Sequence, residues 1–179
     1  MLRLMFVSFT LIVITIYDVQ NVFAKSPSAP TLEYVMSYQA NLAPAQKVDE
    51  NRFIFNVTSG WLTTTDGSTG KLINPCGDWL EVLPNGSRML DVRCTIRMDD
   101  NSLIYIKYTG RTKLYKTGAE KREKGQATSG TDAYFITSPT FHTTSEKYMW
   151  MNDAVFINKW VETGANVSYV KYDVYIVKP

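Results

Sequence analysis

Polar and apolar side chains alternate strictly along two segments of the chain, and this pattern constrains the fold more than any other feature. The segments are residues 89–98 and 169–177. On one face of the first lie Val92, Cys94, Ile96 and Met98, and on one face of the second lie Val170, Tyr172, Val174 and Ile176. A period of two is typical of a β-strand with one buried face, since successive side chains point to opposite sides. The chain must therefore form a sheet.

Runs rich in β-branched and aromatic residues recur along the chain, separated by turn residues. They cover residues 32–42, 52–62, 79–83, 89–98, 103–109, 133–137, 154–160 and 169–177. Eight short strands in one domain predict an all-β architecture, with the choice between a barrel and a sandwich left open. Residues 117–125 have helical composition, and their many charges favour an exposed loop or a single turn of helix.

The N-terminus has the pattern of a secretory signal peptide. A short positive region at Arg3 precedes an apolar run over residues 4–17, and Val22 and Ala24 occupy the −3 and −1 positions of a small-residue cleavage site. We therefore expect a cleaved signal peptide over residues 1–24, with an uncleaved membrane anchor as the alternative.

The rest of the chain is expected to form a flexible leader, residues 25–31, and a single β-domain, residues 32–179. Cleavage would remove one basic and one acidic residue, so the net charge stays +2. This balance predicts no nucleic-acid partner and no stable membrane insertion after cleavage. We expect a secreted or periplasmic protein, in which the sequons at Asn56, Asn85 and Asn166 are potential glycosylation sites.

The chain has two cysteines, Cys76 and Cys94, which flank a predicted β-hairpin. The Asn85-Gly86 pair is typical of a two-residue type I′ turn. A turn centred there places Trp79 opposite Val92, and it brings the two cysteines within one residue of each other. Because an exported protein folds under oxidising conditions, we predict a Cys76–Cys94 disulfide.

The same register places three charged residues on one face of the hairpin: Asp78, Asp91 and Arg93. An arginine between two carboxylates is a rigid set of hydrogen-bond donors that can orient a polar ligand. If the face points into a barrel, a ligand-binding role is favoured. If it points to solvent, the three residues form a structural salt-bridge cluster.

Five ordered motifs resemble one known family. They are Gly77-Asp78-Trp79, Leu90-Asp91-Val92-Arg93, Asp99-Asp100 followed by Leu103-Ile104-Tyr105, Tyr134-Phe135 with Pro139 and Phe141, and Tyr148-x-Trp150-x-Asn152. Over residues 33–177 the chain is similar to the family called domain of unknown function 3237. This resemblance implies a small antiparallel up-and-down β-barrel, related in shape to the ligand-holding calycins. The biochemical role of the family is unsettled. The chain departs from the family pattern at Asn101 and His142.

The candidate ligand-binding residues combine the charged trio with aromatic and amide side chains. They are Asp78, Asp91, Arg93, Tyr105, Tyr134, Tyr148, Trp150 and Asn152. Tyr148, Trp150 and Asn152 are expected to share one face of a strand or turn, next to Tyr105 and Tyr134. Asp91, Arg93 and Tyr148 are the catalytic candidates. The single histidine, His142, is either a lone general base or, as we favour, a surface residue on a loop.

Three functions fit these residues. The first is a secreted barrel that binds a small, partly aromatic or apolar ligand in its interior, and the second is a cofactor-free enzyme of the isomerase, cyclase or lyase type in the same pocket. The third is an interaction protein, with a homo-oligomer as one form of it. No cofactor and no metal site is expected, because the sequence carries no phosphate loop, metal motif or nucleophile motif.

Overall fold

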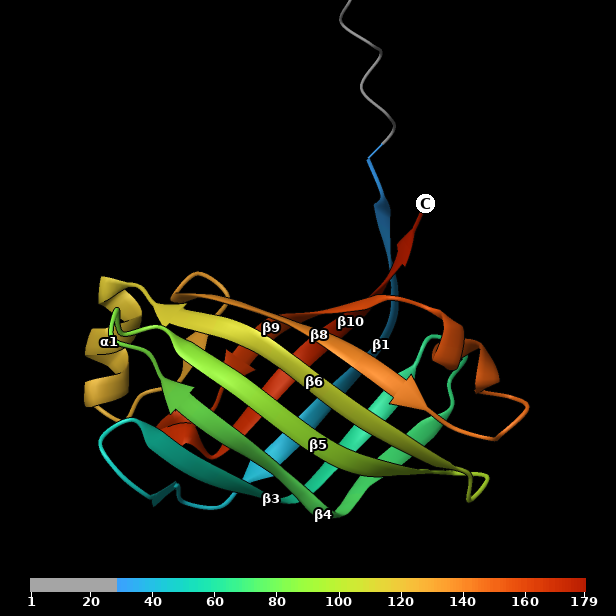
Figure 1. Cartoon of the computed structure of the whole chain (residues 1–179), viewed down its shortest axis with the longest axis horizontal. Coiled ribbons are helices and arrows are strands. Elements are labelled where there is room, and N and C mark those ends of the chain that lie inside the picture. The colour runs from blue at the N-terminus through green and yellow to red at the C-terminus, as the bar shows by residue number, and fades with distance from the viewer. Residues whose placement is uncertain (1–28) are drawn as a thin grey trace, which may run out of the picture.

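The computed structural model describes residues 29–179, which form a closed barrel of antiparallel strands (Figure 1). The long strands are β1 (Thr31–Leu42), β3 (Arg52–Thr64), β4 (Thr69–Val82), β5 (Arg88–Met98), β6 (Leu103–Leu114), β8 (Ala133–His142), β9 (Phe156–Thr163) and β10 (Tyr169–Lys178). The shorter elements are β2 (Gln46–Lys47), α1 (Lys116–Glu123), β7 (Thr128–Ser129) and the 3-10 helices η2 (Met149–Asp153) and η3 (Ala165–Val167).

The long strands pair in chain order, each antiparallel to the next. β1 closes the barrel because it pairs with β10 on one side and with β3 on the other. Each of the eight predicted strands corresponds to one of these strands, and the predicted antiparallel up-and-down β-barrel is confirmed. The pairing of β1 with β3 excludes the sandwich.

Two elements differ from the sequence-based prediction. β4 begins at Thr69 rather than at Trp79, because a register shift between Ile73 and Gly77 lets the strand continue through Pro75. A proline and a glycine inside a run of residues normally indicate a turn, which is why this half of the strand was missed. Residues 116–123 form a helix of eight residues, longer than the loop or single turn expected.

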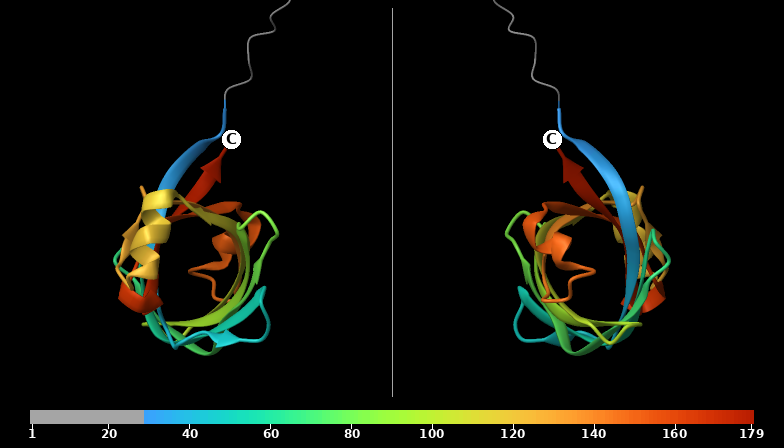
Figure 2. Two further views of the ribbon diagram at one scale, coloured as in Figure 1. Left: turned by 90° about the vertical axis from the view of Figure 1, so that its left-hand side faces the viewer. Right: turned by 90° about the vertical axis from the view of Figure 1, so that its right-hand side faces the viewer.

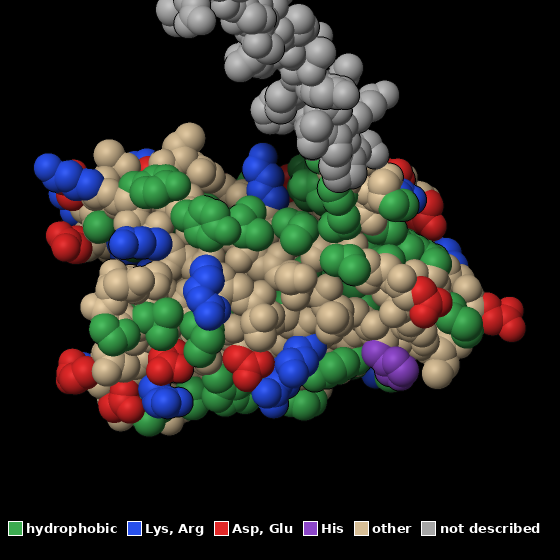
Figure 3. Space-filling view, turned by 45° about the horizontal axis from the view of Figure 1, so that its top comes forward, with side chains coloured by type: hydrophobic (Ala, Val, Ile, Leu, Met, Phe, Trp, Pro, Cys, Tyr) green, Lys and Arg blue, Asp and Glu red, His purple; other side chains and the backbone are tan. Residues whose placement is uncertain are grey.

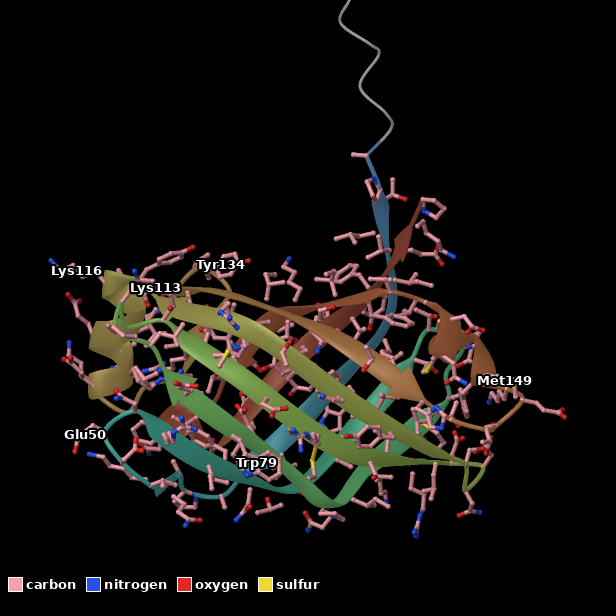
Figure 4. The ribbon with its side chains drawn as sticks, viewed as in Figure 1. Glu50, Trp79, Lys113, Lys116, Tyr134 and Met149 are labelled. Carbon is pink, nitrogen blue, oxygen red and sulfur yellow. A yellow bond between two sulfur atoms is a disulfide. The ribbon has the colours of Figure 1, made fainter. Side chains whose placement is uncertain are left out.

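The two ends of the barrel differ. α1, the loop before β3, the β4–β5 turn and η3 lie at one end, and η2 lies at the other. Figure 2 shows that α1 lies against one side of the ring of strands. Figure 4 places Glu50 and Lys116 at the α1 end, which we call the mouth, and Met149 at the opposite, closed end.

Alternation along each strand directs one set of side chains into the barrel. At the closed end the interior is filled by large apolar residues: Met36, Leu62, Ile96, Met98, Ile104, Phe141, Met151, Phe156 and Val174. Close packing of this kind is what fixes a barrel of eight strands. The closed end therefore has a packed interior, and the larger internal space lies towards the mouth.

Cys76 and Cys94 form the predicted disulfide between β4 and β5, with their Cα atoms 4.1 Å apart and both residues buried. The expected signal peptide, residues 1–24, and most of the expected leader lie outside the described residues. No helix within residues 29–179 is long and apolar enough to span a membrane. On the face shown in Figure 3, basic and acidic side chains are interspersed.

Candidate functional site

A cavity of about 630 Å³ occupies the mouth half of the barrel. This volume lies within the range of 300–1,000 Å³ that is usual for small-molecule sites. Most of its wall is apolar and comes from the inner faces of the strands, and the principal residues are Phe53, Phe55, Leu80, Leu90, Val92, Leu114, Phe135, Trp160 and Val170. The cavity is therefore an apolar chamber, and its few polar groups stand out.

Among the strand residues that line this cavity, Asp78 is the acidic one. It lies on the inner face because the β4–β5 turn is not the predicted two-residue turn. Leu83 and Ser87 are joined by a backbone hydrogen bond of 2.8 Å, so the loop holds three residues and ends with Gly86 at a φ of 77°. That arrangement is the three-residue hairpin with glycine in the left-handed position.

The extra loop residue shifts the register by one. Asp78 pairs with Val92 rather than with Arg93, and Gly77 pairs with Arg93. A shift of one residue moves a side chain to the other face of a sheet. The prediction that Asp78, Asp91 and Arg93 share one face is therefore wrong: Asp78 points inward, whereas Asp91 and Arg93 point outward.

Burial in the apolar chamber raises the pKa of Asp78 from 3.8 to about 7. The neighbouring Asp91 carboxylate raises this pKa further, and the backbone N–H of Asp91, which donates to Asp78 Oδ1 at 3.1 Å, lowers it. The net effect leaves a carboxyl group that changes its protonation near neutral pH. A group of this kind can donate or accept a hydrogen bond, depending on the molecule that occupies the chamber.

Three buried tyrosines pack together at the floor of the cavity: Tyr108 and Tyr172 line it, and Tyr38 packs against both of these rings. The ring centroids of Tyr38 and Tyr172 are 5.2 Å apart, and those of Tyr108 and Tyr172 are 5.9 Å apart. Burial is the main cause that raises the pKa of all three phenols, and the Asp78 carboxyl raises those of Tyr108 and Tyr172 further. All three therefore stay protonated and present neutral hydroxyl groups.

Asn158 on β9 links Tyr38 to Thr137 by hydrogen bonds. Its Nδ2 donates to the hydroxyl of Tyr38 at 2.8 Å and to Oγ1 of Thr137 at 2.9 Å. All three residues are buried, and Asn158 is fully so. The two hydrogen bonds of its Nδ2 fix the positions of Tyr38 and Thr137, while its buried Oδ1 has no hydrogen-bond partner among the described residues.

Two arginines stand at the mouth of the cavity, Arg88 on β5 and Arg122 on α1. α1 is held against the barrel by Lys121, whose Nζ lies 2.8 Å from Oδ2 of the buried Asp132. This ion pair lowers the pKa of Asp132, so the pair is charged at neutral pH. Arg122 follows Lys121 directly, and its position at the mouth depends on that anchor.

Several predicted site residues lie on the outside of the barrel. Asp91 and Arg93 form an exterior ion pair of 2.9 Å, and Arg93 also stacks over the exposed ring of Trp79. This corresponds to the salt-bridge alternative for these two residues. Tyr105 and Tyr134 are exposed on outer strand positions, opposite His142 and Lys113, so they are not neighbours.

The Tyr148-x-Trp150-x-Asn152 motif lies at the closed end, away from the cavity. Tyr148 lies in the turn that precedes η2, and Trp150 and Asn152 lie within η2. The three residues do not share a face, because Tyr148 is buried, whereas Trp150 and Asn152 are exposed. Tyr148 and Trp150 line a second pocket of about 320 Å³ at this end. Asn152 fastens the loop by hydrogen bonds of 3.0 and 2.9 Å to the backbone of Thr143. His142 is exposed, as favoured, but lies on β8 rather than on a loop.

The sequence analysis missed most residues of the observed cavity and of the polar network next to it. Tyr38, Tyr108 and Asn158 each continue an inward series of alternate residues, which is a signal that periodicity could have found. Arg88 also continues such a series, because it lies on the same face of β5 as Leu90 and Val92. Arg122 had no such signal, since it reaches the mouth through the packing of α1.

The model of a family described as protein of unknown function, DUF3237, matches residues 30–177. A UPF0311 protein of Clostridium acetobutylicum is 35% identical over 88 residues, which cover 49% of this chain and little more than half, 56%, of that relative. A UPF0311 protein of Bradyrhizobium diazoefficiens is 25% identical over 134 residues, covering 72% of this chain and 87% of the relative.

Solved structures share the barrel. A β-barrel-like protein from Acinetobacter baumannii has a TM-score of 0.70 at 25% identity, covering 87% of this chain and all of its own. A protein of unknown function from Clostridium acetobutylicum has a TM-score of 0.73 at 25% identity, covering 85% and 99%. An enzyme from Penicillium herquei has a TM-score of 0.60 at 15% identity, covering 87% and 99%, and this likeness concerns the fold alone.

Proposed function

The chain belongs to the DUF3237 family, and from this membership and the geometry of the barrel we propose that it binds a small, partly aromatic or apolar molecule in the mouth half of its interior. The observation that carries the proposal is the apolar cavity of about 630 Å³ with the Asp78 carboxyl group inside it. An unfilled chamber forfeits contacts between its walls, which a ligand would restore. The polar floor would fix the orientation of that ligand.

The combination of a hollow half and a packed half supports binding over a merely structural role. Apolar side chains pack the inner face of the strands at the closed end, where the second pocket is about half as large, so the chain has the means to fill most of a barrel. At the mouth it instead surrounds a space with Phe135, Trp160 and Tyr172, whose rings contact one another at 5.4–5.5 Å between centroids. Such a rigid aromatic wall is preorganised for a flat, apolar partner.

A second candidate is a cofactor-free enzyme in the same cavity, of the isomerase, cyclase or lyase type. It is favoured by one observation, the pKa of about 7 for Asp78, because a general base works best when its pKa lies near the working pH. Asp78 replaces Asp91, Arg93 and Tyr148 as the catalytic candidate, since those three side chains do not line the cavity.

We also propose that the protein works outside the cytoplasm, either secreted or in a periplasm. The Cys76–Cys94 disulfide supports this location, because disulfides persist in oxidising compartments. Mass spectrometry of the protein recovered from its native host tests the proposal. An intact disulfide together with an N-terminus after Ala24 is the expected result, and a reduced protein that begins at Met1 would contradict it.

Fluorescence titration with the neutral probe N-phenyl-1-naphthylamine tests binding in the interior. We expect saturable enhancement for the wild type and a loss of at least about tenfold in affinity for Leu90→Trp, whose added ring would fill the chamber. Val92→Phe provides a second, milder filling of the same space. Thr109→Trp is the matched control, because it adds the same ring on an exposed outer position of β6.

Thermal unfolding of each variant shows whether it folds, and only folded variants enter the comparison. Equal affinity in the wild type and in both cavity variants would contradict interior binding. For the enzyme candidate, mixtures of aromatic and alicyclic metabolites are incubated with the protein and followed by mass spectrometry. Turnover that is lost in Asp78→Asn while probe binding persists supports catalysis, and unchanged turnover rejects the role of Asp78.

A further inference from the structure

Arg88 and Arg122 form a pair of basic groups at the mouth of the cavity. Arg88 begins β5 on an inner position, paired with Val82 and Thr112, and Arg122 approaches from α1. Both side chains are partly buried and both line the cavity. Burial lowers the pKa of each guanidinium, and their proximity lowers that of Arg122 further. The two guanidinium groups therefore line the same cavity mouth and are partly desolvated.

Residues 29–179 provide no counter-charge for this pair. No ion pair within residues 29–179 includes Arg88 or Arg122. Arg122 Nη2 donates to Oγ1 of Thr128 at 3.0 Å, while its buried Nε has no hydrogen-bond partner among the described residues. A desolvated charge is costly unless a fixed partner offsets it. The arrangement is thus incomplete without a negative group.

The two carboxyl groups that line the cavity do not fill this role. Glu50 lies at the rim, almost fully exposed, and pairs with Lys47 at 2.9 Å. Asp78 lies on the inner face with its ionised form disfavoured by burial, and it forms no ion pair with either arginine. An anion that satisfies Arg88 and Arg122 must therefore come from outside the described barrel.

We propose that the ligand of the cavity is a monoanion, with an apolar or aromatic body in the chamber and a carboxylate held between Arg88 and Arg122 at the mouth. This inference rests on the proposed function, since it names the class of molecule that the same cavity takes. Guanidinium groups suit a carboxylate because their planar N–H donors match its two oxygens. Leu90 and Trp160 line the space between the arginines and the polar floor, where the body of the molecule would lie.

A purely structural role for the two arginines makes a different prediction. Long basic side chains often cover apolar surface with their methylene groups and leave the charge in water. In that case, a negative charge on the ligand would be irrelevant to affinity. The experiment must therefore vary the charge of the ligand while its shape stays constant.

Naphthalene-2-carboxylate and naphthalene-2-carboxamide form such a matched pair. Each is titrated as a competitor against N-phenyl-1-naphthylamine on the full barrel, using the wild type, Arg88→Met and Arg122→Met. Methionine keeps the apolar length of the side chain and removes the charge. Arg111→Met is the control, because Arg111 is exposed on the outside of β6 and its loss changes the net charge equally.

We expect the carboxylate to bind the wild type about tenfold more tightly than the carboxamide, as charge-assisted hydrogen bonds allow. Each cavity variant should lose about that factor for the carboxylate and change less than about twofold for the carboxamide. Arg111→Met should behave as the wild type.

Equal affinities of the two competitors for the wild type would overturn the inference and leave interior binding intact. Equal losses for both competitors in the two variants would do the same, because they would indicate a packing role. If neither the probe nor either competitor binds the folded wild type, the proposed function itself fails.

Discussion

Asp78 on β4 pairs with Val92 on β5, so its carboxyl group lies inside the barrel. A position one residue away would have placed it on the outer surface beside Arg93. Because of this register between β4 and β5, the chamber contains an acid with a pKa near neutrality. The following predictions depend on it and on the groups that surround it.

The Asp78→Asn variant tests the buried acid through stability. Because the pKa of Asp78 is raised from 3.8 to about 7, the folded state binds more protons than the unfolded state between these values. The unfolding free energy of the wild type should therefore fall as pH rises from 4 to 7, by roughly 2–4 kcal/mol. Asparagine keeps the acceptor for the N–H of Asp91, so the variant should lose this slope and exceed the wild type in stability at pH 8.

Urea denaturation at pH 4.5, 6, 7 and 8 measures this difference. The groups that surround Asp78 are Asp91, Tyr108 and Tyr172, and the phenols stay protonated throughout this range. Thr109→Asn, on the exposed outer face of β6, is a control that should leave the slope unchanged. Parallel curves for the wild type and Asp78→Asn would mean that Asp78 titrates normally in the folded protein.

The Cys76–Cys94 disulfide should stabilise the barrel by constraining the unfolded chain. The cysteines are 18 residues apart, a loop for which the chain-entropy estimate gives about 3 kcal/mol. We expect the double variant Cys76→Ala, Cys94→Ala to lose about 2–4 kcal/mol in denaturant unfolding, including the cost of two smaller buried side chains. A reductant should destabilise the wild type and leave the variant unaffected. A wild type that is indifferent to reductant would speak against the bond.

Asn158→Leu removes the centre of the buried polar floor. The change leaves the hydroxyls of Tyr38 and Thr137 without their shared donor, so we expect a loss of about 2–4 kcal/mol in unfolding free energy. Tyr38→Phe alone should cost less, about 1 kcal/mol. Because the residues share one network, the double variant should lose less than the sum of the two single losses. Strict additivity would show that they act independently.

The Lys121–Asp132 ion pair should control the position of α1. Asp132→Asn removes the charge that holds Lys121 at 2.8 Å, while the backbone oxygen of residue 132 still accepts from the N–H of Tyr115. We expect faster amide hydrogen exchange over residues 116–124 and unchanged exchange in β5. Glu81→Gln is a control, since Glu81 pairs only at 3.9 Å with Arg52 on the barrel exterior. Unaltered exchange in α1 would show that other contacts suffice to hold it.

The strands themselves could be predicted from local patterns. Strict alternation identified strands such as β5 and β10, and the number and spacing of the strands fitted either a barrel or a sandwich. The barrel was predicted by the resemblance to the family. The strand boundaries were wrong where a strand departs from regular alternation. Pro75 and Gly77 concealed the first half of β4, because the strand tolerates them only through a register shift.

The candidate site was harder to predict than the fold, because it depends on one turn. Asn85-Gly86 is compatible with both a two-residue and a three-residue loop, and the choice moves Asp78 across the sheet. Arg122 illustrates a second reason. Its place at the mouth follows from the packing of α1 against Asp132, a tertiary contact that no local pattern encodes.

The central claim is that a small molecule enters the mouth half of the barrel. Methyl chemical shifts in a ¹³C–¹H NMR titration with N-phenyl-1-naphthylamine test it directly. Leu90 and Val92 line the cavity, whereas Ile96, Ile104 and Val174 fill the closed end. The account predicts large, saturable shifts for the first two residues and little change for the other three. Shifts confined to exterior groups, or spread evenly over both sets, would contradict it.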